Sequence, residues 1–306
     1  MKPHRSPLRL PSATTRAAEI GLLVMVVIWG VNFSVIKVGL AALEPHAFNA
    51  LRYPMAAALL TAGLAATGRL GLPDRADFPR IIGLGILGHV IYQLLFIHGM
   101  DHTRAGNASL LLATAPIHTA ILSGVLDHDR IGTRGWAAIG AAFAGMGLVV
   151  GTGPGGLSFA SGTLTGDLLI LAAAAMWALY TVGARDVVRK YGSLRVTTWV
   201  LWLGALSLFL LGVPDLMAVG SVSATAWAAV AYSGLLGIAV AQLLWYRGVR
   251  LIGSTHTSSF QNLVPVLAIL VAWAWLGEVP TAGQVVGAAV IIAAVSVVRR
   301  SVRAVT

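Results

Sequence analysis

Apolar positions follow one another in long uninterrupted runs along nearly the whole chain, with polar residues gathered between the runs. The runs do not alternate apolar and polar residues with a period of two, so they predict helices rather than strands. Each run holds about 20 residues, which is enough for a helix to cross the roughly 30 Å of hydrocarbon in a bilayer. The pattern predicts an all-α integral membrane protein with ten transmembrane helices, at residues 18–42, 46–67, 79–100, 104–127, 134–152, 166–190, 194–213, 224–248, 254–277 and 281–299.

The amino-acid composition also indicates a membrane protein, and it excludes several kinds of chemical site. Hydrophobic residues make up 57% of the 306 positions and charged residues only 10%, whereas soluble domains carry about 25% charged residues. The chain has no cysteine, which excludes disulfides, thiolate nucleophiles and cysteine metal sites. The first apolar run is too long for the core of a signal peptide, so we expect it to remain as a membrane anchor.

The positive charges are distributed unevenly between the loops. If the N-terminus is cytoplasmic, all of the 21 lysines and arginines except Lys37, Arg52 and Arg104 fall on the cytoplasmic side. Such an excess of positive charge predicts that both termini are cytoplasmic, with basic tails at residues 1–17 and 300–306. The net charge of +10 therefore reflects membrane topology, with lipid and not nucleic acid as the partner. We expect the membrane to be the bacterial inner (plasma) membrane.

A repeat relates the two halves of the sequence. The uncharged segment "GTGPGGLSFASGTLT", residues 151–165, separates five predicted helices from five others. Sliding the chain by 149 positions places Gly88 on Gly237, Gln93 on Gln242, Gly99 on Gly248, Ser109 on Ser258, Pro116 on Pro265 and Asp129 on Glu278; a slide of 148 places Trp29 on Trp177 and Lys37 on Arg185. Because each half holds an odd number of helices, we expect two inverted five-helix repeats, at residues 18–152 and 166–299.

Motifs in both halves resemble a known family. "IWGVNFSVIKVGL" with "EPHAFNALRY" near the start, and "LLWYRGVRLIGSTHTSSFQNLVPVLAILVAWAWLGEVPTAGQVVGAAVIIAAV" near the end, resemble EamA-type repeats of the ten-helix drug/metabolite transporter superfamily. The resemblance covers about residues 18 to 299. The first half departs from the pattern at "LDHDRIGTRGWAAIGAAF", where Asp129 stands in place of the usual glutamate. The resemblance implies a carrier that exports small polar metabolites, often amino acids or their relatives.

Polar and aromatic residues form one stripe on each of several predicted helices, as follows from a rotation of about 100° per residue. Such stripes face the interior of a helical bundle, where they either line a cavity or hydrogen-bond to neighbouring helices. Together they predict a substrate cavity surrounded by the first four helices of each half, with the fifth of each half outside it. The candidate cavity residues are Trp29, Asn32, Lys37, Asn49, His89, Tyr92, Gln93, Thr114, His118, Trp177, Tyr180, Gln242, Trp245, Tyr246, Ser259 and Asn262.

Lys37 has two interpretations, because it lies near the outer end of its helix. Its side chain either snorkels to the outer interface or contacts a substrate carboxylate at the rim of the cavity. Pro116 and Pro265 interrupt equivalent helices, where each removes a backbone donor, so they are either hinges or simple kinks. The G-x-x-x-G motifs Gly147/Gly151 and Gly283/Gly287 predict close helix packing, within the chain or in a homodimer.

No cofactor or metal site is predicted. His98 and His102 have the spacing of metal ligands on a helix, but no third ligand converges with them. Two G-x-G-x-x-G matches, at residues 83–88 and 151–156, lack the strand that a dinucleotide site requires. The "DHD" at residues 127–129 reads as a solvated turn.

These features favour a secondary transporter that moves a small metabolite, most simply an amino acid or relative, by alternating access; the export direction comes from the resemblance alone. Proton coupling would fall to His89 or His118, because every carboxylate lies near a helix end or in a loop. An uncoupled facilitator or channel for neutral polar solutes remains the alternative. A membrane-embedded enzyme would need a nucleophile and a base, or a metal cluster, at one depth, and the histidines are scattered over several helices.

Overall fold

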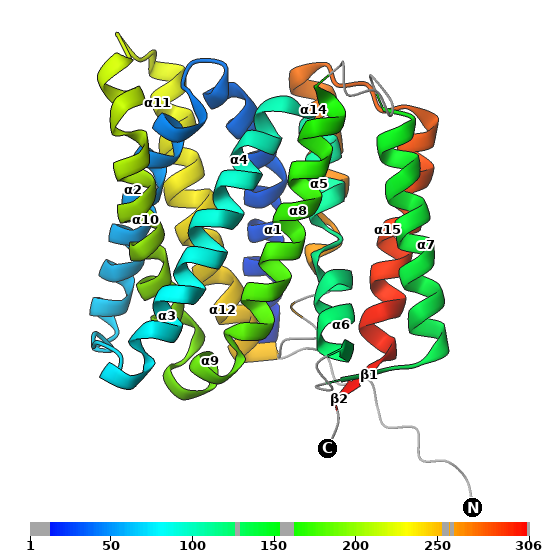
Figure 1. Cartoon of the computed structure of the whole chain (residues 1–306), viewed down its shortest axis with the longest axis horizontal. Coiled ribbons are helices and arrows are strands. Elements are labelled where there is room, and N and C mark those ends of the chain that lie inside the picture. The colour runs from blue at the N-terminus through cyan, green and yellow to red at the C-terminus, as the bar shows by residue number, and fades with distance from the viewer. Residues whose placement is uncertain (1–12, 126–128, 154–161, 253–256, 258–259, 305–306) are drawn as a thin grey trace, which may run out of the picture.

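Helices running side by side make up almost the whole of the computed structural model (Figure 1). The structure describes residues 13–125, 129–153, 162–252, 257 and 260–304. The first half contains α1 (Ala13–Leu40), α2 (Pro45–Ala66), the short η1 (Arg75–Asp77), α3 (Phe78–Gly85), η2 (Ile86–Ile91), α4 (Tyr92–His102), α5 (Ala105–Leu112), α6 (Ala115–Val125), β1 (Asp129–Ile131) and α7 (Thr133–Gly151). The second half contains α8 (Thr163–Gly183), α9 (Arg185–Tyr191), α10 (Ser193–Ala218), α11 (Ala224–Ala231), η4 (Tyr232–Val240), α12 (Ala241–Ile252), α14 (Val264–Leu276), α15 (Ala282–Ser301) and β2 (Val302–Ala304).

Seven helical stretches of the described chain are long and apolar enough to cross a membrane. The apolar helices Val264–Leu276 and Ala282–Val298 are shorter, and α2, although 22 residues long, is not among the seven. Large apolar side chains, such as those of Phe143, Leu206 and Trp273, are exposed on the outside of the bundle. An apolar exterior of this kind requires a hydrocarbon environment, so the chain is an integral membrane protein.

Two pairs of helices pack closely within the chain, α2 with α10 and α7 with α15. Elsewhere α1 packs against α12 and α14, and α8 packs against α4 and α6. The α7–α15 contact is close enough that a Cβ atom on Gly287 would come within 2.7 Å of the carbonyl oxygen of Gly145. These two glycines therefore let the backbones of α7 and α15 meet.

The predicted motif Gly147/Gly151 is not the surface of α7 that packs here, which corrects that assignment. A Cβ atom added to either residue would meet nothing within 4 Å, whereas one on Gly145 would lie 3.0 Å from the carbonyl oxygen of Gly287. The motif of α15 does pack as predicted, since a Cβ on Gly283 would lie against Thr152. The homodimer stays a prediction.

Regular helix is interrupted at corresponding places in the two halves. η2 and η4 are π-helical segments, and residues 86–91 shifted by 149 positions become 235–240, inside η4. A second interruption lies just before Pro116 in α6 and just before Pro265 in α14. Each proline stands in the first turn after the interruption, where its missing N–H costs no helical hydrogen bond.

One small element was not expected from an all-α pattern. β1 and β2 form a two-stranded antiparallel pair, in which Asp129 lies opposite Ala304 and Ile131 opposite Val302. Both segments lie at the lower end of the bundle in Figure 1, beside the lower end of α15. Asp129 therefore belongs to a strand rather than to the predicted turn, whose other residues, 127 and 128, lie outside the described part of the chain.

Candidate functional site

Aromatic side chains from both halves meet inside the bundle. The ring of Trp177 on α8 lies 5.1 Å from that of Tyr92 on α4 and 5.2 Å from that of Tyr180, measured between centroids. His89 of η2 lies 5.6 Å from Tyr180, and Tyr92 stacks on Phe96 at 5.8 Å. Four of the predicted cavity residues, His89, Tyr92, Trp177 and Tyr180, are thus brought together in one aromatic cluster.

Trp29 and Asn32 of α1 form the matching contact with η4. The Nε1 of Trp29 donates a hydrogen bond of 2.9 Å to the carbonyl oxygen of Gly237, and its ring lies 6.1 Å from that of Trp245. Asn32 sits directly on Gly237, where a Cβ atom would come within 2.7 Å of its Oδ1. That Oδ1 is buried and has no hydrogen-bond partner.

A buried polar network lies between α2, α4 and η4. Tyr53 donates a 2.7 Å hydrogen bond to Oε1 of Gln93, whose Nε2 donates to Oδ1 of Asn49 at 3.1 Å. Arg52 donates through Nε to the same Oδ1 at 3.0 Å and through Nη1 to the hydroxyl of Ser233 at 2.7 Å. Asn49 and Gln93 were predicted to line the cavity, and the structure places both in this network instead of leaving them open.

Arg52 was missing from the predicted cavity residues. Its side chain is 2% exposed and is the largest of the fully buried side chains in the described structure. Sequence reasoning grouped it with Lys37 and Arg104 as a charge of the outer half. The signal that could have found it is a lone arginine inside an otherwise apolar helix, because intramembrane charges face the interior and carry function.

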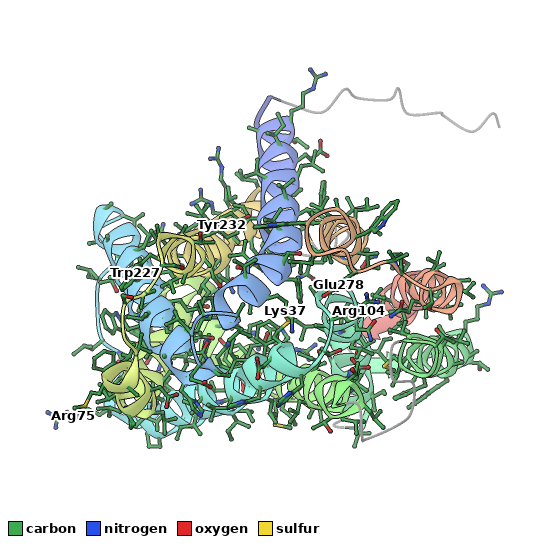
Figure 2. All side chains as sticks on the ribbon, turned by 90° about the horizontal axis from the view of Figure 1, so that it is seen from above. Lys37, Arg75, Arg104, Trp227, Tyr232 and Glu278 are labelled. Carbon is green, nitrogen blue, oxygen red and sulfur yellow. The ribbon has the colours of Figure 1, made fainter. Side chains whose placement is uncertain are left out.

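Lys37 does not extend freely to the interface. Its Nζ donates hydrogen bonds of 2.9 Å and 3.0 Å to the carbonyl oxygens of Met100 and Asp101, at the end of α4. In the view along the helices, Lys37 lies close to Arg104 and Glu278 (Figure 2). Arg104, Glu278 and Gln284 also line a small pocket at this end, between α5 and α14.

Thr114 and His118 lie elsewhere in the bundle. The hydroxyl of Thr114 bonds to the carbonyl oxygen of Leu111 in its own helical segment. His118 lies within hydrogen-bond distance of the carbonyl oxygen of Thr114, and its ring lies 6.4 Å from Phe143 of α7. None of the ring contacts or hydrogen bonds found among the described residues joins this pair to the aromatic cluster.

The remaining predicted residues come from the second half. Gln242 and Trp245 are half-buried on α12, and the hydroxyl of Tyr246 contacts that of Thr197 on α10. Asn262 donates a 3.1 Å hydrogen bond to the hydroxyl of Ser296 on α15, so its amide joins two helices. Ser259 lies outside the described residues.

A second polar network lies near the end of the bundle where α5 begins, around a carboxylate that the sequence had placed only at a helix end. Asp167 of α8 is 1% exposed and accepts hydrogen bonds from Thr103 and Asn107. Asn107 in turn accepts one of 2.6 Å from Gln284 of α15. Glu278 accepts bonds from the backbone N–H groups of Ala105 and Gly106, which start α5. These contacts join the two halves at this end of the bundle.

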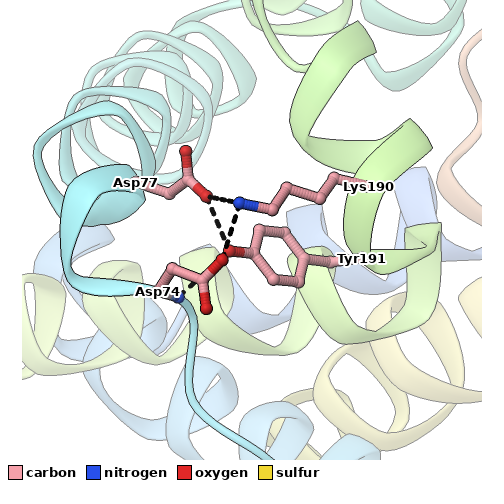
Figure 3. A network of polar contacts seen from close by, with 4 residues as sticks. All are labelled: Asp74, Asp77, Lys190 and Tyr191. Carbon is pink, nitrogen blue, oxygen red and sulfur yellow. Dashed lines mark hydrogen bonds and ion pairs between the residues drawn. The ribbon is translucent and has the colours of Figure 1, made fainter.

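A network of charged residues lies at the opposite end of the bundle (Figure 3). Lys190 of α9 lies 2.6 Å from a carboxylate oxygen of Asp74 and 2.7 Å from one of Asp77, and Tyr191 also bonds to Asp77. The hydrogen bond from Lys190 lowers the pKa of Asp74, because it stabilises the ionised carboxylate. Arg80 and Asp186 form a further ion pair of 2.9 Å. These pairs again join the first half to the second.

Metal binding finds no support in the described part of the chain, where no group of three or more His, Cys, Asp or Glu side chains could hold a metal ion. His98 contacts His46 at 4.8 Å between ring centroids, which makes a pair.

Comparison with known proteins extends these observations. The profile of the EamA-like transporter family matches the chain twice, at residues 16–151 and 164–300. The uncharacterized transporter YdfC of Bacillus subtilis is 30% identical over 273 residues, which cover 89% of this chain and 87% of that protein. A probable terminal-alkyne amino-acid exporter of Streptantibioticus cattleyicolor is 34% identical over 285 residues, covering 91% and 92%. A crystal structure that is 21% identical has the same fold, with a TM-score of 0.66 over 92% of this chain and 96% of that one.

Proposed function

The chain belongs to the EamA-like transporter family, and from that premise we propose that it moves an amino acid or a close relative across the bacterial inner membrane by alternating access. The proposal includes ten membrane crossings in two inverted halves, with both termini in the cytoplasm. It also includes export as the physiological direction. The observation that carries it is the way in which the two halves contact each other around a polar and aromatic interior.

Several contacts between a helix of the first half and a helix of the second half have a counterpart in which the roles of the two halves are exchanged. α1 of the first half packs on η4 and α12, as α8 of the second half packs on η2 and α4. Tyr180 covers Gly88, with a Cβ atom there falling 2.5 Å from its ring, as Asn32 covers Gly237. Ile170 covers Gly99 as Leu22 covers Gly248. The glycines differ by 149 positions and the covering residues by 148, which is what an inverted repeat with a site between its halves would produce.

Alternating access would come from separation of the halves at one end at a time. In the described structure both ends are joined by contacts between the halves, through Glu278 with α5 at the outer end and Lys190 with Asp74 at the inner end. The inner contacts lie between exposed side chains, which exchange readily with water. They therefore add little to the free energy that opening this end would cost.

A zwitterion with a partly apolar side chain fits the interior best. Trp29, Trp177 and Tyr92 offer apolar surface, while Asn32 and Asn49 offer amide groups. The exporter of Streptantibioticus cattleyicolor, 34% identical, is named for an amino-acid substrate with an apolar terminal alkyne. Both observations support an amino acid as the substrate of this chain as well.

Counterflow in proteoliposomes tests the proposal. Liposomes containing the purified protein are loaded with an unlabelled L-amino acid, and uptake of the same labelled amino acid is followed at equal pH on both sides. We expect saturable exchange of one class of amino acids, lost in Asn32→Ala, and exchange at equal pH would favour a carrier that needs no proton gradient. If no amino acid exchanges, with or without an imposed proton gradient, the amino-acid assignment is wrong.

A further inference from the structure

Arg52 is a buried cation whose partners in the described structure are all neutral. Its hydrogen bonds go to the amide of Asn49 and the hydroxyl of Ser233, and its guanidinium lies 5.0 Å from the ring of Phe48. No ion pair of the described residues includes it, and the ionisable groups that act on it most are the phenols of Tyr53 and Tyr92. Burying a charge without a counter-charge is costly, so the arrangement favours the binding of an anion beside Arg52.

The polar network around Arg52 contains hydrogen-bond donors that have no acceptor. Tyr53 donates to Oε1 of Gln93, so the other end of that amide donates to Asn49, and Arg52 donates to the same oxygen. This sequence of bonds fixes the orientation of the Asn49 amide, with Oδ1 occupied twice and Nδ2 free. Nη2 of Arg52 and Nδ2 of Asn49 are both buried and both lack an acceptor.

The two free donors belong to neighbouring groups, because Asn49 and Arg52 stand three residues apart on one face of α2 and are bonded to each other. Two N–H donors beside a positive charge suit the two oxygens of a carboxylate. We infer that Arg52 and Asn49 form the site that binds the carboxylate of the transported substrate, with Ser233 and Gln93 holding them in position. This inference rests on the proposed transport of amino acids.

Neighbouring groups fit the rest of an amino acid. Arg52 is bonded to Ser233, and Asn32 sits on Gly237, one turn further along η4. The free Oδ1 of Asn32 is an acceptor, which suits an ammonium group. Tyr92, which is next in the chain to Gln93 of the network, packs on Trp177 in the aromatic cluster, against which an apolar side chain can pack. Arg52, which supplies a donor for the carboxylate, and Asn32, which supplies an acceptor for the ammonium, therefore contact the same helical segment, η4.

The test measures binding separately from transport. The thermal unfolding midpoint of the purified protein is recorded with L-leucine, its carboxamide L-leucinamide and its deaminated analogue 4-methylpentanoate, and with the same three compounds carrying the phenylalanine side chain. Counterflow of the labelled amino acid is measured in parallel. We expect stabilisation by an amino acid and its deaminated analogue, and at least about tenfold weaker binding of the amide, since a hydrogen bond to a charged group is lost.

The variants are chosen so that loss of folding cannot imitate loss of the site. Arg52→Met should weaken carboxylate binding about 10- to 100-fold and leave the amide unaffected. Asn49→Asp places a carboxylate beside Arg52, so it should unfold no earlier than the wild type and yet lose the preference for acid over amide. Arg75→Met, the same change at an exposed inner position, should bind and exchange as the wild type does.

Each outcome bears on one of the two proposals. If the carboxylates bind in an Arg52-dependent manner but no amino acid exchanges, the carboxylate site stands and amino-acid transport is wrong. If an amino acid and its amide bind equally well, or if Asn49→Asp keeps the preference for the acid, Arg52 is a structural residue and the inference is overturned. Absence of any effect of the carboxylates on the wild-type midpoint overturns it too.

Discussion

Arg52 on α2 and Leu203 on α10 each lie against one of two glycines that are 149 positions apart. A Cβ atom on Gly85 would lie 2.5 Å from the side chain of Leu203, and one on Gly234, which is 149 positions later, would lie 2.6 Å from the backbone of Arg52. Leu203 meets its glycine through a half-buried aliphatic side chain, whereas Arg52 meets its glycine through the backbone and carries a buried guanidinium with a free donor. Close contacts at glycines thus recur 149 positions apart, whereas the buried cation with its free donor belongs to the first half.

Removing the buried cation from the first half should have the largest effect on transport. Arg52→Leu replaces the buried cation with an aliphatic side chain and should reduce the counterflow kcat/KM by about 30-fold or more, as removal of a charged hydrogen-bond donor does. Leu203→Met conserves volume, so it should change kcat/KM less than threefold. The comparison would fail if both variants lost activity equally, provided that both elute as the wild type does in gel filtration.

The two glycine contacts should respond similarly to an added methyl group. Gly88→Ala and Gly237→Ala each place a Cβ atom less than 3 Å from the side chain that covers the glycine, Tyr180 or Asn32. Overpacking of this kind costs about 1–3 kcal/mol, which thermal unfolding in detergent would report as a lower midpoint. Asn32→Ala should restore the midpoint of Gly237→Ala, because it removes the clashing amide. Unchanged midpoints in both glycine variants would contradict the close approach.

The tryptophans related by the repeat should differ in their contribution to stability. Trp29→Phe removes the hydrogen bond to the carbonyl oxygen of Gly237, at a cost of about 1 kcal/mol. Trp177→Phe shortens a ring that packs on Tyr92 and Tyr180, with no described hydrogen bond to lose, and should cost less. Chemical denaturation of the two variants side by side measures the difference; a larger loss for Trp177→Phe would reverse the expected order.

The smallest effect is expected at the exposed ion pairs of the inner end. Lys190→Met should lower the unfolding midpoint only slightly, and the difference from the wild type should shrink in high salt. The pKa of Asp74 lies below its ordinary value in the folded protein, so its contribution is present above the unfolded pKa and is lost as pH falls through the folded pKa. The difference should therefore persist from pH 7 to pH 5, and its disappearance in that range would contradict the assignment.

How much the sequence revealed depended on the kind of signal. Apolar runs predicted the all-helical membrane architecture because burial in lipid imposes one long pattern. The repeat stays a prediction, although Gly88 and Gly237, and likewise Pro116 and Pro265, stand in similar local structure. The β1–β2 pair escaped notice because two three-residue strands 173 positions apart leave no period to detect (Asp129 and Val302).

The candidate site was harder to predict, because a stripe shows which face of a helix is polar but not which partner it meets. Asn49 and Gln93 were recognised as interior, yet their bonds to Arg52 and Tyr53 depend on how α2 lies against α4 and η4. Asn262 was expected in the cavity, and the sequence alone did not show its hydrogen bond to Ser296 of α15. Arg52 itself was visible in the sequence but was judged by its charge rather than by its depth.

Cross-linking at the end of the bundle that holds Asp74 and Tyr191 tests alternating access most directly. The chain has no native cysteine that could react with the cross-linking reagent. The backbone N–H of Asp74 donates a 3.0 Å hydrogen bond to the hydroxyl of Tyr191, so Asp74→Cys and Tyr191→Cys place two thiols close enough to be joined by a short reducible bifunctional thiol reagent. We expect counterflow to stop when the link forms and to return when it is reduced, while either single variant treated with the reagent keeps its activity. Full counterflow through fully cross-linked protein would contradict a mechanism in which the two halves separate at this end.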